Sequence, residues 1–205
     1  MANNYKNLDT LLNRNEIKKN INYILNNYNN EDNEKKGIFV YGNNGSGKTL
    51  FIKNLLKENN NDYIYFDGTD IKSNNFIENL YENNTSNMNV ISLFNKSPKT
   101  IIIVIDDIDS INSSDKNTLT NLIKLVRQKK TKKQKLERRT NSPIIFIGNK
   151  DSEKKICELI KVCNVFKIDS PTNQQIFDIL NTYILNKNIM NYYEKFITYS
   201  EYNFH

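Results

Sequence analysis

Eight residues in the first quarter of the chain, Gly42-Asn-Asn-Gly-Ser-Gly-Lys-Thr49, leave little freedom for the fold around them. An apolar run over residues 37–41 precedes them, and a helical pattern follows to about Glu58. They match the pattern G-x-x-x-x-G-K-[S/T], in which backbone N–H groups at a helix N-terminus surround phosphate oxygens. With only six glycines in the chain, we expect roughly 0.002 chance matches to this pattern. The segment therefore predicts a phosphate-binding loop between a buried strand and a helix.

Each residue type in this loop has a defined role in holding a nucleotide. The glycines let successive N–H groups point at one anion, Lys48 bridges the β- and γ-phosphates, and the Thr49 hydroxyl ligates Mg²⁺. The predicted cofactors are therefore ATP and Mg²⁺. The predicted nucleotide-binding residues run from the first glycine into the helix: Gly42, Asn43, Asn44, Gly45, Ser46, Gly47, Lys48, Thr49 and Leu50.

Four more short apolar runs follow along the chain, at residues 63–66, 100–105, 143–148 and 164–168. Helical patterns lie around and between them, at residues 15–28, 48–58, 76–81, 115–126 and 153–160. Strands and helices that alternate in this way form a parallel sheet covered on both faces. We therefore expect an α/β fold, with a five-stranded parallel sheet and helices on both of its faces.

The two ends of the chain differ from this alternating middle. Asn15 is expected to cap the first helix. After Ser170-Pro171 only helical patterns remain, at residues 174–185 and 192–199. We therefore expect a nucleotide-binding α/β domain over residues 1–170 and a short, partial helical lid over residues 171–205.

Two acids, Asp106 and Asp107, close the most apolar run of the sequence. A carboxylate at the end of a buried strand, at the same edge of the sheet as a phosphate loop, suits a metal that is also held by phosphates. Asp106 is therefore expected to be the second protein partner of Mg²⁺, beside Thr49.

Several classes of function are excluded by what the chain lacks. The last residue, His205, is the only histidine, so catalytic triads and histidine metal centres are excluded. Cys157 and Cys163 have a C-x5-C spacing that suits neither a disulfide scaffold nor zinc, and we expect both to be buried small apolar residues. No apolar run approaches the roughly 18 residues of a membrane span, and the N-terminus lacks a signal-peptide core. We expect an intracellular protein with no membrane partner.

The positive charge of the chain is concentrated in one segment, Arg127 to Arg139. It carries eight basic residues against one glutamate, a local charge of +7, so the rest of the +6 chain carries −1. The segment contains no aromatic residue, so any nucleic-acid contact would be to phosphates and independent of base sequence. Contact with a DNA backbone, a solvated loop and a nuclear-localisation patch remain open interpretations.

The order of these motifs resembles the AAA+ family of P-loop ATPases. An extra strand separates the phosphate loop (Walker A) from the acidic strand end (Walker B), and a later strand ends in Asn149. In that family the asparagine at this place, called sensor 1, positions the attacking water or reads the γ-phosphate. The resemblance therefore implies a catalytic role for Asn149.

A narrower resemblance is to the sliding-clamp loaders, and within them to the large subunit of replication factor C. Phe66-Asp-Gly-Thr-Asp-Ile-Lys72 is similar to the N-A-S-D-x-R segment of clamp-loader subunits, and Tyr5 with residues 8–12 echoes their N-terminal motif near adenine. Residues 142–149 and 161–169 are also similar to the large subunit. The resemblance covers roughly residues 5–185.

Arginine is absent where clamp-loader small subunits use it. Those subunits carry Ser-Arg-Cys before the fifth strand, and the arginine serves as a finger in a neighbour's ATP site. The aligned residues here are Lys161-Val162-Cys163, and no arginine follows Arg139. Neither the finger nor the lid arginine called sensor 2 is present, which agrees with a role like that of the large subunit.

Asp107 stands where AAA+ enzymes usually carry the glutamate that activates water. Aspartate is shorter by one methylene, so its carboxylate reaches less far toward the water. Asp109 is a possible stand-in, although a cap at a helix start is the preferred interpretation of Asp109-Ser110. ATP binding is therefore better supported than hydrolysis.

These observations favour an ATPase that resembles a clamp-loader subunit and turns over slowly in isolation. The alternatives are a structural subunit that binds ATP without effective turnover, and another AAA+ class such as an origin initiator or helicase loader. The resemblance implies other AAA+ subunits, a sliding clamp and DNA as partners. It also implies a location in the nucleus or wherever DNA is replicated, with the cytoplasm as an alternative.

Overall fold

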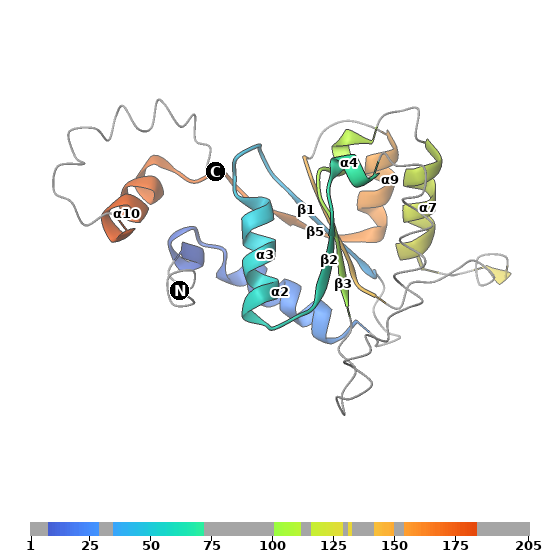
Figure 1. Cartoon of the computed structure of the whole chain (residues 1–205), viewed down its shortest axis with the longest axis horizontal. Coiled ribbons are helices and arrows are strands. Elements are labelled where there is room, and N and C mark those ends of the chain that lie inside the picture. The colour runs from blue at the N-terminus through green and yellow to red at the C-terminus, as the bar shows by residue number, and fades with distance from the viewer. Residues whose placement is uncertain are drawn as a thin grey trace.

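A computed structural model describes seven parts of the chain, residues 8–28, 35–71, 101–111, 116–128, 131–132, 142–149 and 154–183. Residues 8–11 are helical. The elements that follow, coloured along the chain in Figure 1, are α2 (Asn15–Asn26), β1 (Gly37–Tyr41), α3 (Lys48–Glu58), β2 (Tyr63–Phe66), α4 (Gly68–Ile71), β3 (Ile102–Ile105), the 3₁₀ turn η1 (Ile108–Ser110), α7 (Lys116–Val126), β4 (Ile144–Gly148), α9 (Lys154–Val162), β5 (Cys163–Lys167) and α10 (Asn173–Tyr183).

The five strands form one parallel sheet in the order β2-β3-β4-β1-β5. The strand that precedes the phosphate loop, β1, is therefore separated from the acidic strand β3 by β4. Since all strands run in the same direction, their carboxyl ends lie along one edge of the sheet. The end of β4 accordingly lies between the ends of β1 and β3, and ligands bind at such edges in open α/β sheets.

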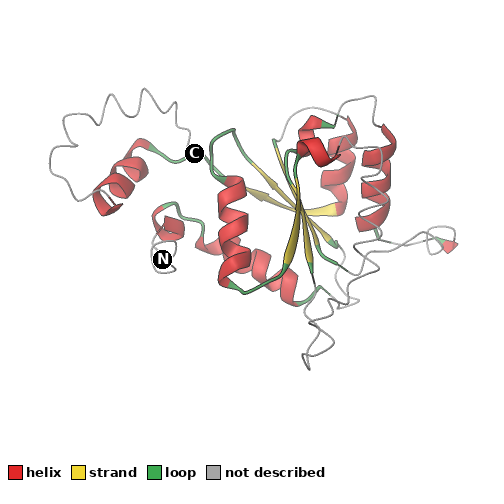
Figure 2. Ribbon diagram, viewed as in Figure 1, coloured by secondary structure: helices red, strands yellow, loops and turns green. Residues whose placement is uncertain are grey.

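Helices cover both faces of the sheet, and Figure 2 shows them on either side of the strands. On one face, α2 and α3 pack on Ile38, Val40 and Ile145 through a buried apolar cluster. On the other face, η1, α7 and α9 pack on Phe39, Phe146 and their neighbours. Alternate residues of one strand thus enter opposite cores, which is why the strands read as continuous apolar runs.

The predicted α/β fold with a five-stranded parallel sheet is confirmed, and all five predicted strands are present. The bounds of β1 and β2 are as predicted, and the ends of the other three strands differ from the prediction by at most two residues. Asn15 does not cap the first helix, because Arg14 occupies the cap position and Asn15 is the first helical residue. The predicted helices at 76–81 and 192–199 lie outside the described residues.

A short helix that was not predicted, α4, follows β2 directly. Its start is stabilised by Asp67, whose carboxylate accepts hydrogen bonds from the backbone N–H groups of Thr69 and Asp70 at 2.8 and 3.1 Å. This is the hydrogen-bonding pattern of a helix cap. The segment after β2 is therefore helical earlier than expected.

The prediction for the two cysteines is half right. Cys163 at the start of β5 is buried, and burial raises the pKa of its thiol to about 12. Cys157 is exposed, because α9 turns Ile156 and Leu159 into the core and Cys157 lies on the outer side of the helix. Helix periodicity, rather than residue type, determines which cysteine is inside.

The described part of the expected lid is α10, which is joined to the N-terminal segment. Thr172 and Gln175 cap the start of α10 reciprocally, with each side chain bonded to the other residue's backbone N–H. The Gln175 amide also donates to the carbonyl oxygen of Leu11 at 3.0 Å.

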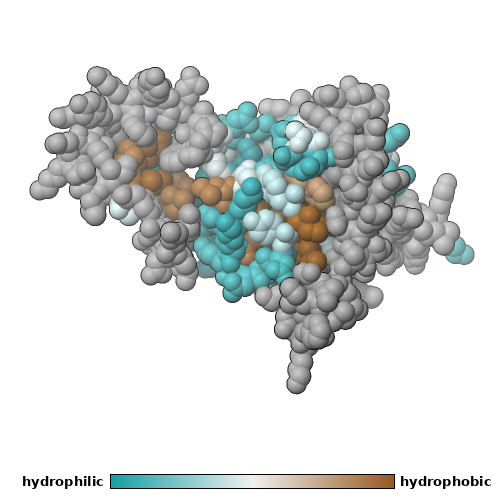
Figure 3. Space-filling model, viewed as in Figure 1, coloured by the Kyte–Doolittle hydropathy of each residue, from teal (hydrophilic) through white to brown (hydrophobic). Residues whose placement is uncertain are grey.

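In Figure 3 apolar residues gather over α10, whereas hydrophilic residues cover the outer side of α3. The boundary at residues 170/171 stays a prediction.

Candidate nucleotide-binding site

A cavity of about 710 Å³ opens at the carboxyl ends of β1, β3 and β4. Of the residues predicted from the sequence, those that line it are Asn44, Gly45, Gly47, Lys48, Thr49, Leu50, Asp106, Asp107 and Asn149. Gly42 and Asn43 line an adjacent cavity of about 550 Å³ that shares Asn44, Asp109 and Asn149 with the first. Ser46 belongs to the same loop but is buried and lines neither cavity.

Two glycines give the loop its shape. Gly45 and Gly47 have φ angles of 72° and 80°, in the left-handed region where a side chain is strained. Gly47 is also the cap residue of α3, so the helix starts at Lys48 and turns its first N–H groups toward the cavity. A helix N-terminus of this kind attracts anions. The loop therefore has the backbone geometry of a phosphate site.

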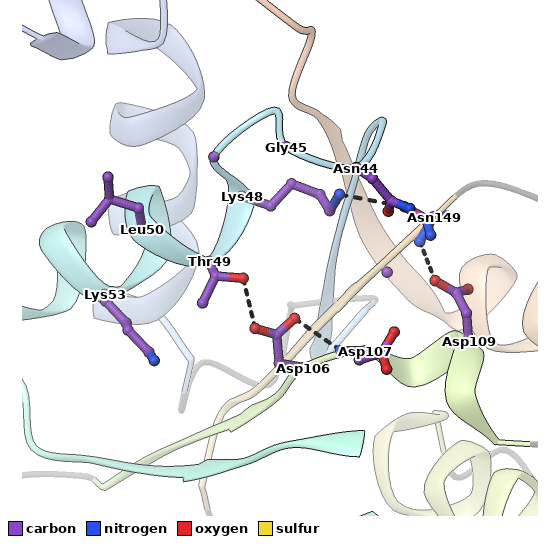
Figure 4. Close-up of a pocket in the computed structure, with 12 residues that line it drawn as sticks. Asn44, Gly45, Lys48, Thr49, Leu50, Lys53, Asp106, Asp107, Asp109 and Asn149 are labelled. Atoms are coloured by element: carbon purple, nitrogen blue, oxygen red, sulfur yellow. Dashed lines mark hydrogen bonds between the residues drawn. The ribbon is translucent and has the colours of Figure 1, made fainter. Parts of the chain in front are cut away.

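Lys48 extends from the first residue of α3 across the loop. Its ammonium donates to the carbonyl oxygens of Gly42 and Asn43, both at 2.8 Å, and to Asn149 Oδ1 at 3.4 Å. Burial lowers the pKa of Lys48, and the carboxylates of Asp106, Asp109 and Asp107 oppose this, in that order. Figure 4 shows the side chain pointing at Asn149. The cation is thus held between the loop and the end of β4.

Thr49 and Asp106 meet at the lower side of the cavity. The Thr49 hydroxyl donates to Asp106 Oδ2 at 2.6 Å, and the N–H of Asp107 donates to Oδ1 at 2.8 Å (Figure 4). A hydroxyl and a carboxylate at hydrogen-bond distance suit Mg²⁺, which takes few protein oxygens and completes its shell with water and phosphates. The two residues predicted as metal partners are brought together, and Mg²⁺ bound there would neutralise charge on phosphate oxygens.

Asn149 lies directly after β4, between the loop and the acids, and is anchored by Asp109. The Asp109 carboxylate accepts the backbone N–H of Asn149. The pKa of Asp109 is raised, first by burial and then by the nearby charge of Asp107, against the lowering effects of that hydrogen bond and of Lys48. The interpretation of Asp109 as a helix-start cap is therefore wrong. Asp109 lies within η1 rather than before a helix, and its side chain reaches across to Asn149 at the end of β4.

The family model of the AAA proteins, described as the ATPase family associated with various cellular activities, matches residues 38–170. The chain belongs to this family. The matched part spans from β1 to the residue before Pro171 and includes the phosphate loop, Asp106 and Asn149. Among curated proteins, none matches the chain closely enough to count as a relative. Membership in the AAA family implies ATP binding with Mg²⁺ and nucleotide hydrolysis as the general activity.

Asp107, which follows Asp106 at the end of β3, has a left-handed backbone conformation. Its φ is 53°, in the left-handed region, and its side chain is exposed. A Cβ built on Gly68 would lie 2.8 Å from Asp107 Oδ2, so the carboxylate lies against the start of α4. In Figure 4 it is the acid between Asp106 and Asp109. Its catalytic role stays a prediction.

Three residues of the site were not assigned a role from the sequence. The Tyr65 hydroxyl donates to Asp106 Oδ2 at 2.6 Å, which raises the tyrosine pKa in addition to the larger effect of burial. The Lys53 ammonium lies 3.7 Å from the centre of the Tyr65 ring. Lys53 follows Thr49 by four residues on α3, and Tyr65 pairs in register with Val104, two residues before Asp106. Helix periodicity could therefore have placed Lys53 beside Thr49, whereas only the folded sheet brings Tyr65 to Asp106.

The third residue is Arg14, which the sequence marks only as one of four arginines. It is 6% exposed, and its guanidinium donates to the carbonyl oxygen of Ser46 at 2.6 Å. No spacing rule links the residue before α2 to the phosphate loop. Only the folded structure brings the two together.

The remaining AAA features lie partly outside the described residues. Val162, which the clamp-loader resemblance places at the finger position, is half-buried and packs on the core at the end of α9. Of the basic segment Arg127 to Arg139, only Arg127, Gln128, Thr131 and Lys132 are described, so its DNA contact stays a prediction. In the described part of the chain, no helix combines the length and apolar character needed to cross a bilayer.

Proposed function

We propose that the chain is an AAA subunit that binds Mg²⁺-ATP, hydrolyses it slowly on its own, and works like the large subunit of a sliding-clamp loader in DNA replication or repair. The observation that carries the proposal is the contrast between two halves of one site. The phosphate and metal half is complete, with Lys48 bonded to the loop carbonyls and Thr49 bonded to Asp106. The half that activates water has the shorter Asp107 in place of glutamate.

The geometry around Asp107 supports slow hydrolysis. Its carboxylate lies toward Gly68 rather than toward Lys48, and among the three acids it has the smallest effect on the pKa of Lys48. A general base must lie within hydrogen-bond reach of the water it activates. A shorter side chain directed at α4 meets that requirement less well than a glutamate.

The resemblance of residues 66–72 to a clamp-loader segment supports the narrower assignment. The described part of this segment, residues 66–71, forms the end of β2 and the short helix α4 beside η1. The apolar Val162 at the finger position also fits a subunit whose own finger serves no partner. In this proposal a neighbouring AAA subunit supplies the arginine to the cavity, and the basic segment Arg127 to Arg139 contacts the DNA backbone.

A structural role for bound ATP is the second candidate. Asp107 and the lack of any arginine after Arg139 favour it, because both remove groups that assist hydrolysis. Here the nucleotide would hold an interface together while other subunits turn ATP over. Slow turnover that stays slow in the assembled complex would support this candidate over the first.

Capture by a sliding clamp tests the clamp-loader assignment. The purified chain is passed over the immobilised clamp of its own organism, with and without Mg²⁺-ATP, and Lys48→Ala serves as the nucleotide-free comparison. The exposed Lys57 lies on the same helix, so Lys57→Ala is the matched control. ATP-dependent retention of the wild type and of Lys57→Ala, but not of Lys48→Ala, is expected. No retention in any condition, with ATP binding intact, would favour an origin initiator or helicase loader.

A further inference from the structure

Arg14 is a buried cation directly beneath the phosphate loop. It lies between the helical residues 8–11 and α2 and is 6% exposed. Burial lowers the pKa of its guanidinium, and the charges of Asp9 and Asp169 oppose this. A buried charge is costly unless it is paired or hydrogen-bonded. The contacts of the guanidinium must therefore compensate for its burial.

The closest polar contact of Arg14 is with the backbone of the loop. Its Nη2 donates to Ser46 O at 2.6 Å, and its guanidinium lies 5.9 Å from the centre of the Phe51 ring on α3. Among the described residues it forms no ion pair at salt-bridge distance. The guanidinium is thus directed at one carbonyl group of the loop.

That carbonyl belongs to the same peptide unit as the N–H of Gly47. The described residues contain no cis peptide bond, and in a trans peptide the C=O and the following N–H point in opposite directions. Ser46 is buried, whereas Gly47 lines the cavity. Holding the Ser46 oxygen toward Arg14 therefore turns the Gly47 N–H away from the interior, toward the anion site.

The conformation of Gly47 explains why the hydrogen bond from Arg14 to Ser46 O matters for the loop. Gly47 has φ 80°, and glycine adopts positive and negative φ angles about equally well. The peptide unit before it therefore has little intrinsic preference for one orientation. The Arg14 Nη1 also lies 3.4 Å from where a Cβ on Gly47 would be. The guanidinium thus supports the loop from behind with both a hydrogen bond and close packing.

We propose that Arg14 is a positioning residue of the phosphate loop, which through Ser46 fixes the Gly47 N–H toward the polyphosphate and so raises nucleotide affinity. This inference rests on the nucleotide binding proposed above. The guanidinium contributes its charge as well, because a cation in a low-dielectric interior acts on a nearby anion with little screening.

The test compares Arg14→Met, Arg14→Lys and a matched control, Lys18→Met. Lys18 is also a cation of the N-terminal region, but it pairs with Asp9 and Glu58, both at 2.6 Å, and does not touch the loop. ADP affinity is measured by calorimetry for each variant. The six glycine amides are followed by ¹⁵N-glycine NMR during titration with inorganic pyrophosphate.

We expect Arg14→Met to weaken ADP binding by about ten-fold, the effect of one hydrogen bond to a charged group. Arg14→Lys should recover part of that loss, because its ammonium keeps the charge and can donate to a carbonyl. Lys18→Met should lower stability but leave ADP affinity within about two-fold, since its contacts lie apart from the loop. In the wild type, pyrophosphate should shift the Gly47 resonance strongly, and in Arg14→Met this shift should shrink.

Two results would overturn the inference while leaving nucleotide binding in place. One is an ADP affinity of Arg14→Met equal to that of the wild type. The other, which needs no variant to fold, is a Gly47 resonance in the wild type that pyrophosphate moves no more than that of Gly37, which is at the start of β1 and does not line the cavity. A wild type that binds neither ADP nor pyrophosphate would overturn the proposed function and this inference together.

Discussion

At the scale of single residues, the site divides into contacts that a motif predicts and contacts that only the fold creates. The motif places Lys48 and Thr49, and the strand end places Asp106, because phosphate and Mg²⁺ require those groups in that order along the chain. Arg14 and Tyr65 reach the site from 32 and 41 residues away in sequence. Neither belongs to a local pattern, so their roles depend on which segments pack together.

The first prediction concerns Asp107. The isolated wild type should bind Mg²⁺-ATP and turn it over very slowly, and Asp107→Glu should turn it over at least as fast, because the longer side chain extends further toward the γ-phosphate side of the cavity. Phosphate release at saturating ATP measures both rates. Asp107→Asn is the control that removes the basic carboxylate. Rapid turnover by the wild type that Asp107→Glu destroys would contradict the argument from side-chain length.

At the scale of elements, the sequence predicts which elements exist more reliably than where they end. The strands are found because both of their faces are buried, as Phe39 and Val40 in opposite cores illustrate. Their ends shift because backbone pairing, not residue type, terminates a strand. Cys157 was misplaced because a one-residue step along α9 moves a side chain by about 100° around the helix. The strand order could not be derived from spacing, since several parallel orders satisfy the same connections.

The second prediction concerns the ion pairs that join the N-terminal region to α3. Lys18 contacts Asp9 and Glu58 with its side chain 16% exposed. Burial lowers its pKa, but the hydrogen bonds to both carboxylates outweigh this and raise the pKa above 10.5. A lysine whose pKa is higher in the folded than in the unfolded state stabilises the fold at pH values below its unfolded pKa. This contribution should therefore persist to about pH 10 and fall as the pH rises through the folded pKa.

Lys18→Met should therefore lower the free energy of unfolding by about 2 kcal/mol near neutral pH, somewhat less than for a fully buried pair. Denaturant unfolding from about pH 8 to about pH 11.5 measures how this difference shrinks. The exposed neighbour Lys19 provides the control, as Lys19→Met should change stability little at any pH. A wild-type advantage that is the same at both ends of the range would contradict the assignment.

At the scale of the whole molecule, two segments far apart in sequence are joined around the nucleotide site. Gln175 on α10 donates to Leu11, and Arg14, three residues further along, donates to the loop. The N-terminal segment thus connects α10 to the phosphate loop. Helical periodicity predicted α10, but its attachment to residues 8–14 could not be predicted, because it rests on one amide and one backbone carbonyl.

The third prediction tests this attachment. Gln175→Ala removes both the cap at Thr172 and the bond to Leu11, so α10 and residues 8–11 should exchange their amide hydrogens faster, by about ten-fold for the loss of one to two hydrogen bonds. Gln174→Ala is the matched control, since among the described residues that side chain bonds only Asp178, on the exposed side of the same helix. Equal exchange in both variants would show that Gln175 does not hold α10 in place.

The fourth prediction concerns the basic segment Arg127 to Arg139. If it follows a DNA backbone, affinity should fall steeply with salt and depend little on base sequence, with a slope of log K against log salt of roughly −3 for three or four phosphate contacts. Replacing Lys129, Lys130, Lys132 and Lys133 by glutamine should flatten this slope and leave ATP binding unchanged. A slope unaltered by the four substitutions would assign the segment to a solvated loop.

The most direct test of the central claim is calorimetric titration of the isolated protein with Mg²⁺-ATP, in the wild type and in Lys48→Ala. Lys48 is half-buried and bonds only loop carbonyls and Asn149 among the described residues, so its loss should leave the fold and the thermal midpoint intact. We predict one ATP per wild-type chain and a loss of affinity of about 100-fold or more in Lys48→Ala. Unchanged ATP affinity in Lys48→Ala, or no ATP binding by the folded wild type, would contradict the account.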